Sequence, residues 1–308
     1  MMKKEVVDYR VSDVRSFSEL ISRMEQGWGF EAAQLANAYR IILEMVNDKE
    51  CVKFLSLTAN LVSTGLRGVV AEMIRKGLCD VIITTGGTFD HDIAKSISKY
   101  YRGEFFMDDR DLKKKEIHRL GNILIPQESY GLVIESFTMK MLREITREKK
   151  SFSSRELAEE VGKRLSDENS ILRSAYEKKV PVFAPGIVDS AFGTQLFIYS
   201  QTNEFSLNLL KDMKELSDIV FSSKKTGAII LGGGISKHHT IWWNQFKGGL
   251  DYVVSFTTAY EFDGSLSGAR LEEAISWNKV KENASIALIH ADITLVLPIL
   301  LAAVYEKM

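Results

Sequence analysis

The fold is decided by residues 51–92, which read CVKFLSLTANLVSTGLRGVVAEMIRKGLCDVIITTGGTFDHD. Two short apolar runs, CVKFLSLTAN and CDVIITTGGTFD, each end in small or polar residues. Each run leads into a segment with apolar residues at helical spacing, first TGLRGVVAEMIRKG and then HDIAKSISKYY. Strands that alternate with amphipathic helices in this way are typical of a βαβ unit.

The same alternation continues toward the C-terminus. Further apolar runs read VPVFAPGIVDS, GAIILGGG, DYVVSFTTA and ASIALIHAD. Helical candidates between or beside them read EFSLNLLKDMKELSDIVFSS, SKHHTIWWNQFKGG and LEEAISWNKVKE. Near-continuous apolar strands need crossover helices on both faces to bury them. The sequence therefore predicts an α/β fold with a Rossmann-like open, mostly parallel sheet and helices on both faces.

Two regions depart from this alternation. Residues 1–50 contain two helical patterns, SFSELISRMEQ and GFEAAQLANAYRIILEMVNDK, which predict an N-terminal helical extension packed on the main domain. Residues 51–308 are predicted to form one catalytic α/β domain. Within it, residues 103–179 are less regular and predict an excursion with two or three helices. Its charged run DDRDLKKKE is more typical of a solvated face than of a binding site.

Composition excludes several classes of protein. The chain has 308 residues, 45% of them hydrophobic, which supports a substantial core. Forty Lys and Arg balance forty-one Asp and Glu, so no bulk charge favours a nucleic-acid or membrane partner. The N-terminus lacks the apolar run of a signal peptide, and no stretch approaches the ~20 apolar residues of a membrane helix. Cys51 and Cys79 lie too far apart for a redox CxxC pair, which suits buried packing roles in a reducing cytoplasm.

The predicted strand ends carry the candidate chemistry, because open parallel sheets bind ligands beyond the carboxyl ends of their strands. Those ends read TANLVSTG, TTGGTFDHD, PGIVDS, GGGISKHH, TTAYEFDGSLSGAR and HADIT. Their exposed backbone N–H groups and small hydroxyls suit phosphates, and an Asp there can accept from a ribose hydroxyl. The fingerprint GxGxxG is absent, and GGGISK resembles a phosphate loop only loosely. The alternative is that these glycines only permit tight turns.

The histidine pair His238 and His239 follows the triple glycine. No third ligand stands at helical spacing, so we predict no metal site. One of the two imidazoles could act as a general base near neutral pH. The alternative is a histidine at a helix start that is hydrogen-bonded to backbone. Tryptophans such as Trp242 and Trp243 are more often core or interface residues than platforms that stack on a cofactor, so we predict packing roles for both.

The segment SWNK raises a question about Lys279, which stands two positions after Trp277. Most lysines are solvated. A lysine beside a large aromatic ring can instead be desolvated, which lowers the pKa of its ammonium group and yields a nucleophilic amine.

Together these motifs resemble the deoxyhypusine synthase family, in its archaeal form. The resemblance runs from about residue 50 to the C-terminus. It is carried by ANLVSTGLR (59–67), TTGGTFDHD (84–92), HRLGNILIP (118–126), PVFAPGIVDSAFG (181–193), IILGGGISKHH (229–239), TTAYEFDGSLSGARLEEAISWNK (257–279) and ADITLVLPIL (291–300). The last two long motifs are far more specific than any glycine loop.

The resemblance implies an NAD-dependent transferase, which moves the aminobutyl group of spermidine to one lysine of the precursor of translation initiation factor 5A. It implies that Lys279 forms the covalent imine and that His238 transfers protons. The substrate residues it implies are Trp277, Glu273, Asp90, His91, Gly264 and Ser265. For NAD it implies Asn60, Ser63, Thr85, Gly86, Gly87, Asp189, Gly233, Thr258, Ala259 and Asp292. It further implies a homotetramer with active sites at a dimer interface.

Departures from the family pattern leave alternatives open. Thr194 and Leu266 stand where acidic residues are expected to face the polyamine, and His91 replaces a second glutamate beside Asp90. Each lost carboxylate removes a charge-assisted partner worth ~1 to 3 kcal/mol. One alternative is therefore a homospermidine synthase-like aminobutyltransferase with a small amine acceptor. Another is a non-catalytic NAD-binding or scaffold protein, for which Lys279 would serve no purpose. The role of residues 1–50 stays open.

Overall fold

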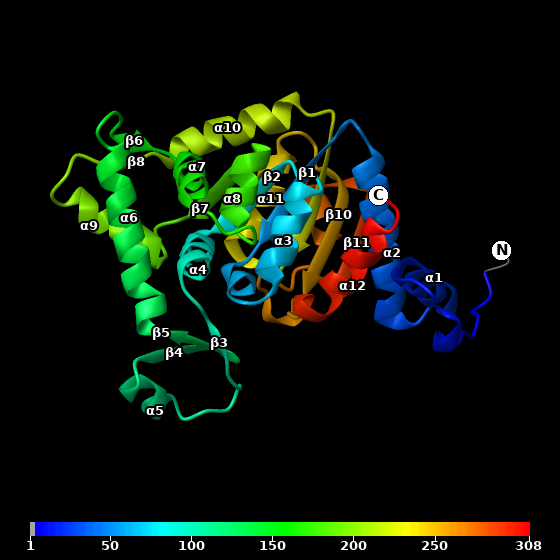
Figure 1. The fold of residues 1–308 in the computed structure, drawn as a ribbon. Coiled ribbons are helices and arrows are strands. Elements are labelled where there is room, and N and C mark those ends of the chain that lie inside the picture. Colours follow the sequence, from blue (N-terminus) through cyan, green and yellow to red (C-terminus); the bar gives the residue numbers. More distant parts are fainter. Residues whose placement is uncertain (1–3) are drawn as a thin grey trace. The chain divides into compact units, whose positions relative to one another are not determined.

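The structure is a computed structural model that describes residues 4–308. The chain divides into two compact units, one formed by residues 4–56 and 218–308 and the other by residues 57–217 (Figure 1). The predicted division into an arm, residues 1–50, and one domain, residues 51–308, stays a prediction.

The first unit contains strands that run side by side. They are β1 (Cys51–Leu57), β9 (Lys225–Leu231), β10 (Leu250–Thr257) and β11 (Val280–His290), in the order β11-β10-β9-β1. Strand β10 pairs in parallel with both β9 and β11, in a register that sets Thr257 opposite His290. The carboxyl ends of β10 and β11 therefore lie next to each other.

The first unit also contains the helices α1 (Phe17–Gly27), α2 (Phe30–Asn47), α11 (Gly234–Gln245) and α12 (Ile293–Tyr305). Helix α11 contacts β9, β10 and β11. Helix α1 begins where the Ser16 side chain accepts a hydrogen bond from the backbone N–H of Glu19. Helices α1, α2 and α12 lie together, and α2 contacts β10 and β11 (Figure 1). The two helices predicted in the first fifty residues are thus present.

The second unit contains the parallel pair β2 (Val81–Thr85) and β7 (Val182–Gly186). Its helices are α3 (Leu66–Arg75), α4 (Gly86–Ile97), α6 (Gly131–Ile145), α7 (Ser154–Arg164), α8 (Ile171–Lys178) and α9 (Ala191–Ser200). The irregular region folds partly as an antiparallel sheet of β3 (Tyr101–Arg102), β4 (Ile117–Leu120) and β5 (Ile123–Pro126), with α5 (Asp109–Lys114) after β3. In addition, β6 (Ser151–Phe152) pairs with β8 (Ser206–Leu207), and α10 (Leu209–Ser222) leads out of the unit.

The predicted α/β class is confirmed, because strands pair in parallel at β9-β10-β11 in the first unit and at β2-β7 in the second, and each unit combines these strands with helices. One local expectation is wrong. LEEAISWNKVKE is not a helix, since it holds a single 3-10 turn, Glu273–Trp277, and then enters β11. The cause is Asn278, whose φ of 54° lies in the left-handed region and ends the turn.

The burial of individual residues agrees with two predictions made from the sequence. Cys51 and Cys79 are both buried, which confirms their predicted packing position. Most of the run DDRDLKKKE is exposed, with only Leu112 buried, which confirms a solvated face. No helix within residues 4–308 is long and apolar enough to cross a membrane.

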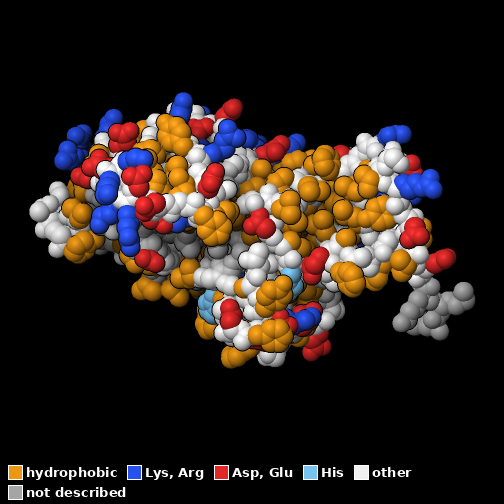
Figure 2. Space-filling view, turned by 90° about the horizontal axis from the view of Figure 1, so that it is seen from below, with side chains coloured by type: hydrophobic (Ala, Val, Ile, Leu, Met, Phe, Trp, Pro, Cys, Tyr) orange, Lys and Arg blue, Asp and Glu red, His pale blue; other side chains and the backbone are white. Residues whose placement is uncertain are grey.

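Several large hydrophobic side chains nevertheless reach the surface. Figure 2 shows hydrophobic side chains interspersed with charged ones on one face of the molecule. The most exposed large ones are Phe30, Phe106, Phe262, Leu210 and Val11. Single exposed apolar residues are ordinary on a protein surface, whereas a contiguous apolar patch marks a contact surface.

Candidate active site

A cavity of about 220 Å³ in the first unit gathers the chemistry predicted near the C-terminus. Its wall is formed by α11 and by the segment between β10 and β11. The lining residues are Lys237, His238, Ile241, Leu266, Ala269, Arg270, Leu271, Glu273, Ala274, Trp277 and Lys279. The structure thus brings together Lys279, His238, Trp277 and Glu273, four of the predicted site residues.

Lys279 lies inside this cavity rather than in solvent, with 8% of its surface exposed. The left-handed turn at Asn278 directs the chain from the 3-10 turn into β11 just at this residue. The Nζ atom lies 5.0 Å from the ring centre of Trp277 and 5.7 Å from that of Trp242. Its amine therefore has an indole on two sides, as the sequence suggested for Trp277 alone.

His238 faces the same cavity from α11. Its imidazole stacks on Trp242, with ring centres 5.6 Å apart and an angle of 24° between the planes. Burial and then the positive charge of Lys279 lower the pKa of His238, which keeps its imidazole neutral at pH 7. A neutral imidazole beside a reactive amine can accept a proton. Trp242 was predicted as a packing residue, and its place over Lys279 was missed.

His239 has a different task from its neighbour. Its Nε2 atom accepts a hydrogen bond from the indole N–H of Trp243 at 3.1 Å. Burial and then the charge of His238 lower the pKa of His239 to about 4. Trp243 is buried, so this pair is a packing contact within α11 and not a proton relay to the cavity.

Lys237 is a cavity residue that sequence reasoning missed. It is 1% exposed, and its Nζ atom donates a hydrogen bond to the backbone carbonyl of Ala269 at 2.9 Å. Burial lowers the pKa of Lys237 to about 8, although the charge of Glu273 opposes the shift. The signal was available, because Lys237 stands four positions before Ile241 on the buried face of α11.

The loop between β10 and the 3-10 turn covers part of the cavity. Ser267 accepts a hydrogen bond from the backbone N–H of Gly234, and a Cβ atom at Gly233 would collide with Ser267. The loop is therefore pressed against the start of α11. The predicted substrate residues Gly264 and Ser265 lie earlier in it, at a tight turn where Gly264 has a φ of 69°. Neither of these two lines the cavity.

In the second unit, Asp90 and His91 lie side by side on α4, but their contacts are internal. The Asp90 carboxylate accepts from the backbone N–H groups of Ala191 (3.0 Å) and Phe192 (2.7 Å) at the start of α9. It also accepts from the Tyr130 hydroxyl at 2.8 Å. Burial raises the pKa of Asp90, and these three hydrogen bonds oppose that shift. Asp90 thus caps α9.

His91 is also enclosed by aromatic side chains. Its Nδ1 atom lies 2.9 Å from the hydroxyl of Tyr100, and its ring lies 5.5 Å from that of Tyr130. Burial and then the charge of Lys95 lower the pKa of His91 to about 4. The imidazole is therefore neutral at pH 7 and cannot replace the charge of a carboxylate.

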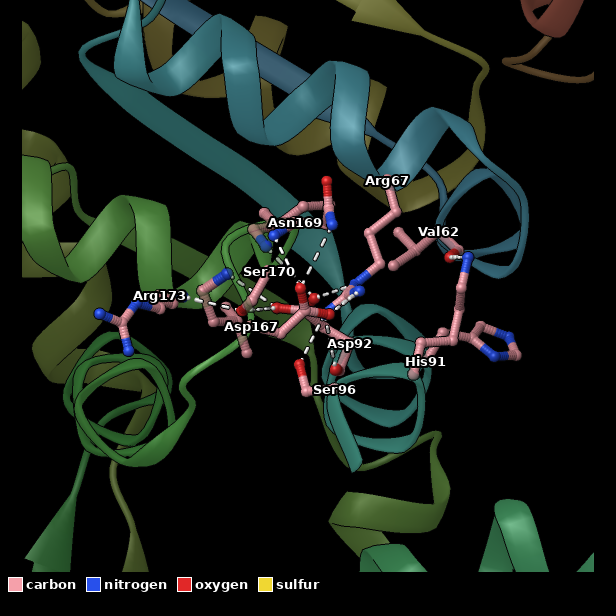
Figure 3. A network of polar contacts seen from close by, with 12 residues as sticks. Val62, Arg67, His91, Asp92, Ser96, Asp167, Asn169, Ser170 and Arg173 are labelled. Atoms are coloured by element: carbon pink, nitrogen blue, oxygen red, sulfur yellow. Dashed lines mark hydrogen bonds and ion pairs between the residues drawn. The ribbon is translucent and has the colours of Figure 1, made fainter. Parts of the chain in front are cut away.

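A buried ion network fixes α4 from its other side (Figure 3). The Arg67 guanidinium donates to Asp92 and to Asp167, each at 2.6 Å. Asp92 also accepts from the Ser170 hydroxyl at 2.8 Å and from two backbone N–H groups at the start of α8. Figure 3 shows the His91 ring directed away from this network. The network joins α3, α4 and α8 and so positions Asp90 and His91.

Residues predicted to bind NAD in the second unit lie at strand ends. Thr85 is the residue before α4 and makes no side-chain cap, so the first N–H groups of this helix are not satisfied by it. Gly86 must be glycine, because a Cβ atom would lie 2.6 Å from the carbonyl oxygen of Ile187. Asn60 is exposed, whereas the buried Ser63 hydroxyl donates to the Asn60 carbonyl at 2.7 Å. Asp189 is exposed in the turn after β7.

Residues predicted to bind NAD in the first unit lie at the neighbouring ends of β10 and β11 or precede α11. Thr258 is exposed directly after β10, and the Ala259 N–H donates to the Thr257 hydroxyl at 3.1 Å. Asp292 caps α12, accepts from Leu295 N–H at 3.2 Å and remains exposed. Gly233 precedes α11 and provides no side-chain cap. Exposed carboxylates at strand ends accept from ribose hydroxyls, and helix N-termini offer backbone N–H groups to phosphates, so these residues fit NAD.

The two departures from the expected acidic pattern are visible as well. Leu266 lines the cavity as an apolar residue, and Glu273 is the only carboxylate among the lining residues of this described cavity. Thr194 lies on α9, where its hydroxyl donates to the Ser190 carbonyl at 2.9 Å. No cluster of three potential metal ligands occurs within residues 4–308.

Comparisons with known proteins show the family of this chain. The family model for deoxyhypusine synthase matches residues 19–304. A "probable deoxyhypusine synthase" of Sulfurisphaera tokodaii is 53% identical over 304 residues, which cover 98% of this chain and 97% of the relative. A protein of the same description from Sulfolobus acidocaldarius is also 53% identical, with the same coverage.

A solved structure supports the fold. The crystal structure of a proposed deoxyhypusine synthase from Entamoeba histolytica superposes with a TM-score of 0.66 at 20% identity, covering 98% of this chain and 97% of that one. By the match over residues 19–304 and the identity to the archaeal relatives, this chain belongs to the deoxyhypusine synthase family, enzymes that transfer the aminobutyl group of spermidine to a lysine of the precursor of translation initiation factor 5A.

Proposed function

We propose that this chain performs the family's transfer with Lys279 as the residue that carries the aminobutyl group. The observation that supports this most is the position of the Lys279 amine, buried in a cavity between the indoles of Trp277 and Trp242. A lysine amine bonds to an electrophilic carbon only in its free-base form, through its lone pair. The resulting imine is a cation when protonated, and indole faces stabilise cations at this distance.

The other cavity residues have complementary roles in this proposal. NAD, when bound, supplies the hydride acceptor and donor that a transfer without net oxidation requires. His238 holds the proton exchanged at the secondary amine of spermidine, since its imidazole is neutral and lines the cavity. Glu273 binds the terminal ammonium of the butyl chain by a charge-assisted hydrogen bond. The apolar side chains of Leu266 and Leu271 suit the methylene groups between them.

The aminobutyl group is then transferred in two steps. In each step one amine replaces another on the butyl carbon. The Lys279 nitrogen forms a bond to the butyl carbon as the bond from that carbon to the departing diamine breaks, and the departing nitrogen takes up a proton. The acceptor lysine later replaces Lys279 in the same way. Because Lys279 is regenerated, it is a covalent catalyst and not a reagent.

The remaining predicted residues are proposed with the tasks that the resemblance implies. Asp90, His91, Gly264 and Ser265 are proposed to contact substrate. In this proposal Asp90 and His91 contact substrate and also keep their contacts within the second unit. NAD is proposed to bind the strand-end residues Asn60, Ser63, Thr85, Gly86, Gly87, Asp189, Gly233, Thr258, Ala259 and Asp292. The prediction of a cytoplasmic location also stays a prediction.

We further propose the homotetramer with active sites at a dimer interface. The exposed side chains of Phe30, Phe106 and Leu210 supply apolar surface for such contacts. Light scattering coupled to size-exclusion chromatography tests this, and a monomer at micromolar concentration would contradict it.

One labelling experiment tests the proposed reaction. The chain is incubated with NAD and with spermidine labelled in its butyl group, with and without the precursor of translation initiation factor 5A. We expect label on the precursor and, after borohydride reduction without the precursor, on the peptide that contains Lys279. Label that appears only in homospermidine when putrescine is added would instead support the small-amine alternative. The family comparisons do not favour that alternative.

A further inference from the structure

Tyr260 and His290 form a stacked aromatic pair at the edge of the first unit's strands. Their ring centres lie 5.2 Å apart and their planes differ by only 7°. The parallel register of β10 and β11 explains this pairing, because it sets Thr257 opposite His290 and so places the residues after β10 beside the end of β11. The pair is therefore built by the sheet and not by a chance contact of loops.

The pair is held in place, yet one ring face stays open. The backbone N–H of His290 donates to the Glu31 carboxylate at 3.0 Å, and Gly268 packs so closely on the Tyr260 carbonyl that a Cβ atom would collide with it. Tyr260 is nevertheless 62% exposed, although His290 covers one of its faces. The Nδ1 atom of His290 is buried without a hydrogen-bond partner among the described residues. A buried polar atom of this kind marks a place where a ligand contact can form.

The surroundings of the pair indicate a dinucleotide. Thr258 and Ala259 immediately precede Tyr260, and Asp292 stands two residues after His290 with its carboxylate exposed. A carboxylate at such a strand end accepts from ribose hydroxyls, and an open aromatic face stacks on a base. The nicotinamide must reach the cavity of Lys279, and Tyr260 does not line that cavity. The other base is therefore the one available to this platform.

We propose that the Tyr260–His290 pair is the platform on which the adenine base of NAD stacks. This inference rests on the proposed function, in which the chain uses NAD. Tyr260 supplies the contact face, and His290 supports it from behind.

Binding constants of Tyr260→Ala, Tyr260→Phe and Phe262→Ala test the platform. Phe262 is the matched control, since it is an aromatic residue in the same segment that is 90% exposed. Dissociation constants are measured by calorimetry for NAD, ADP-ribose and nicotinamide mononucleotide. We expect Tyr260→Ala to weaken NAD and ADP-ribose about 10-fold, because stacking of one base contributes about 1–3 kcal/mol. Nicotinamide mononucleotide should bind unchanged, and Tyr260→Phe and Phe262→Ala should resemble the wild type.

Four results would overturn the proposal. ADP-ribose binding that Tyr260→Ala leaves unchanged would remove the platform while the proposed function stands. An equal loss for nicotinamide mononucleotide would show a general disturbance of the site, and a comparable loss in Phe262→Ala would show no specific role for Tyr260. A wild-type chain that binds no NAD at all would overturn the proposed function together with the platform. Melting temperatures of all variants are measured alongside, and Tyr260→Leu, which keeps an apolar side chain but has no ring to stack on a base, replaces Tyr260→Ala in the test should that variant fold poorly.

Discussion

Lys279 lies beneath Trp277, with its Nζ atom 5.0 Å from the centre of the indole ring, and only 8% of the lysine is exposed. Trp277 itself is 60% exposed. The indole therefore covers the amine while its own outer surface faces solvent. Trp242 covers the amine from α11. This arrangement separates the nucleophile from bulk water and leaves one aromatic wall at the surface, where a long substrate could enter.

Replacement of Lys279 by alanine should abolish transfer. We expect at least a 10³-fold loss of kcat, since no other group can carry the aminobutyl fragment, while NAD affinity changes little. Lys281→Ala is the matched control, because Lys281 lies two residues further along β11 but pairs with Asp251 at 2.6 Å. Mass spectrometry after borohydride reduction should find a butylamine-sized adduct on wild type and on Lys281→Ala only. Substantial turnover by Lys279→Ala would exclude the covalent role.

Removal of the outer indole should weaken catalysis without abolishing it. We expect Trp277→Ala to lower kcat/KM for spermidine about 10-fold, from lost cation–π and apolar contact, and Trp277→Phe to lower it less. Trp28→Ala is a suitable control, because Trp28 is similarly exposed at 65% but follows α1, away from the cavity lining. Steady-state kinetics with varied spermidine measure the effect. Equal values for Trp277→Ala and Trp28→Ala would mean that the indole does not contact the substrate.

The strands of the sheet could be predicted from the sequence, but not every contact in the cavity could be. Apolar runs and helical spacing are local properties, so β1, β2, β7, β9, β10 and β11 were all found from pattern. The strand-end rule selected the segment that contains His238, whereas Lys279 was singled out by its position beside Trp277, and the structure places both residues in the lining of one cavity. The boundary error at residues 271–282 arose because one left-handed residue, Asn278, overrides an amphipathic pattern.

The contacts that were not predicted depend on the direction in which side chains point. Trp242 and Lys237 both belong to α11, and one sequence cannot show which of its faces meets the segment that contains Ala269. Likewise, the resemblance implied only a substrate contact for Asp90, whereas its hydrogen-bond partners, the N–H groups of Ala191 and Phe192, lie about a hundred residues away along the chain. Long-range partners of this kind follow from packing rather than from local pattern.

The charge of Lys279 should be detectable at His238. Burial and that charge lower the pKa of His238, so Lys279→Ala should raise it, whereas Lys281→Ala should leave it unchanged. NMR titration of the imidazole resonances measures both values. In the wild type we also expect activity to fall as the pH drops through the His238 pKa, below 6.5, because a protonated imidazole cannot accept a proton. An identical His238 pKa in wild type and Lys279→Ala would contradict the proximity of the two groups.

Two buried histidines should make stability depend on pH. The pKa values of His91 and His239 are lowered to about 4 in the folded chain, against 6.5 as the ordinary value. Between pH 4 and 6.5 the unfolded chain therefore binds protons that the folded chain does not, and the free energy of unfolding falls as the pH falls through this window. Each histidine contributes at most about 1.4 kcal/mol per pH unit.

Urea unfolding at pH 5, 6 and 7 measures this dependence. We expect His91→Gln to be less stable than wild type at pH 7, because glutamine fits the aromatic pocket less well, but to show a shallower loss of stability toward pH 5. His118→Gln serves as the control, since His118 lies in the edge strand β4, outside both buried clusters. A pH slope that His91→Gln leaves unchanged would show that His91 does not stay neutral on folding.

Lys237 should position the loop that carries the cavity wall. Its amine donates to the Ala269 carbonyl at 2.9 Å, so Lys237→Met removes the donor but keeps the apolar stem. We expect the KM for spermidine to rise roughly tenfold with a smaller change in kcat, since about 1 to 1.5 kcal/mol of loop positioning is lost. Lys237→Arg keeps a donor and should recover part of the loss.

The rate of cleavage by trypsin measures how firmly the same loop is held, because Arg270 follows Ala269 and its side chain is 57% exposed. Cleavage after Arg270 should be faster in Lys237→Met than in wild type. Lys247→Met is the matched control, since Lys247 is another lysine with a buried Nζ atom, just beyond α11 and absent from the cavity lining. It should lower overall stability without changing cleavage at Arg270 or the KM. Equal cleavage in all three proteins would show that the hydrogen bond from Lys237 does not hold the loop, and the buried amine would then need another role in the cavity.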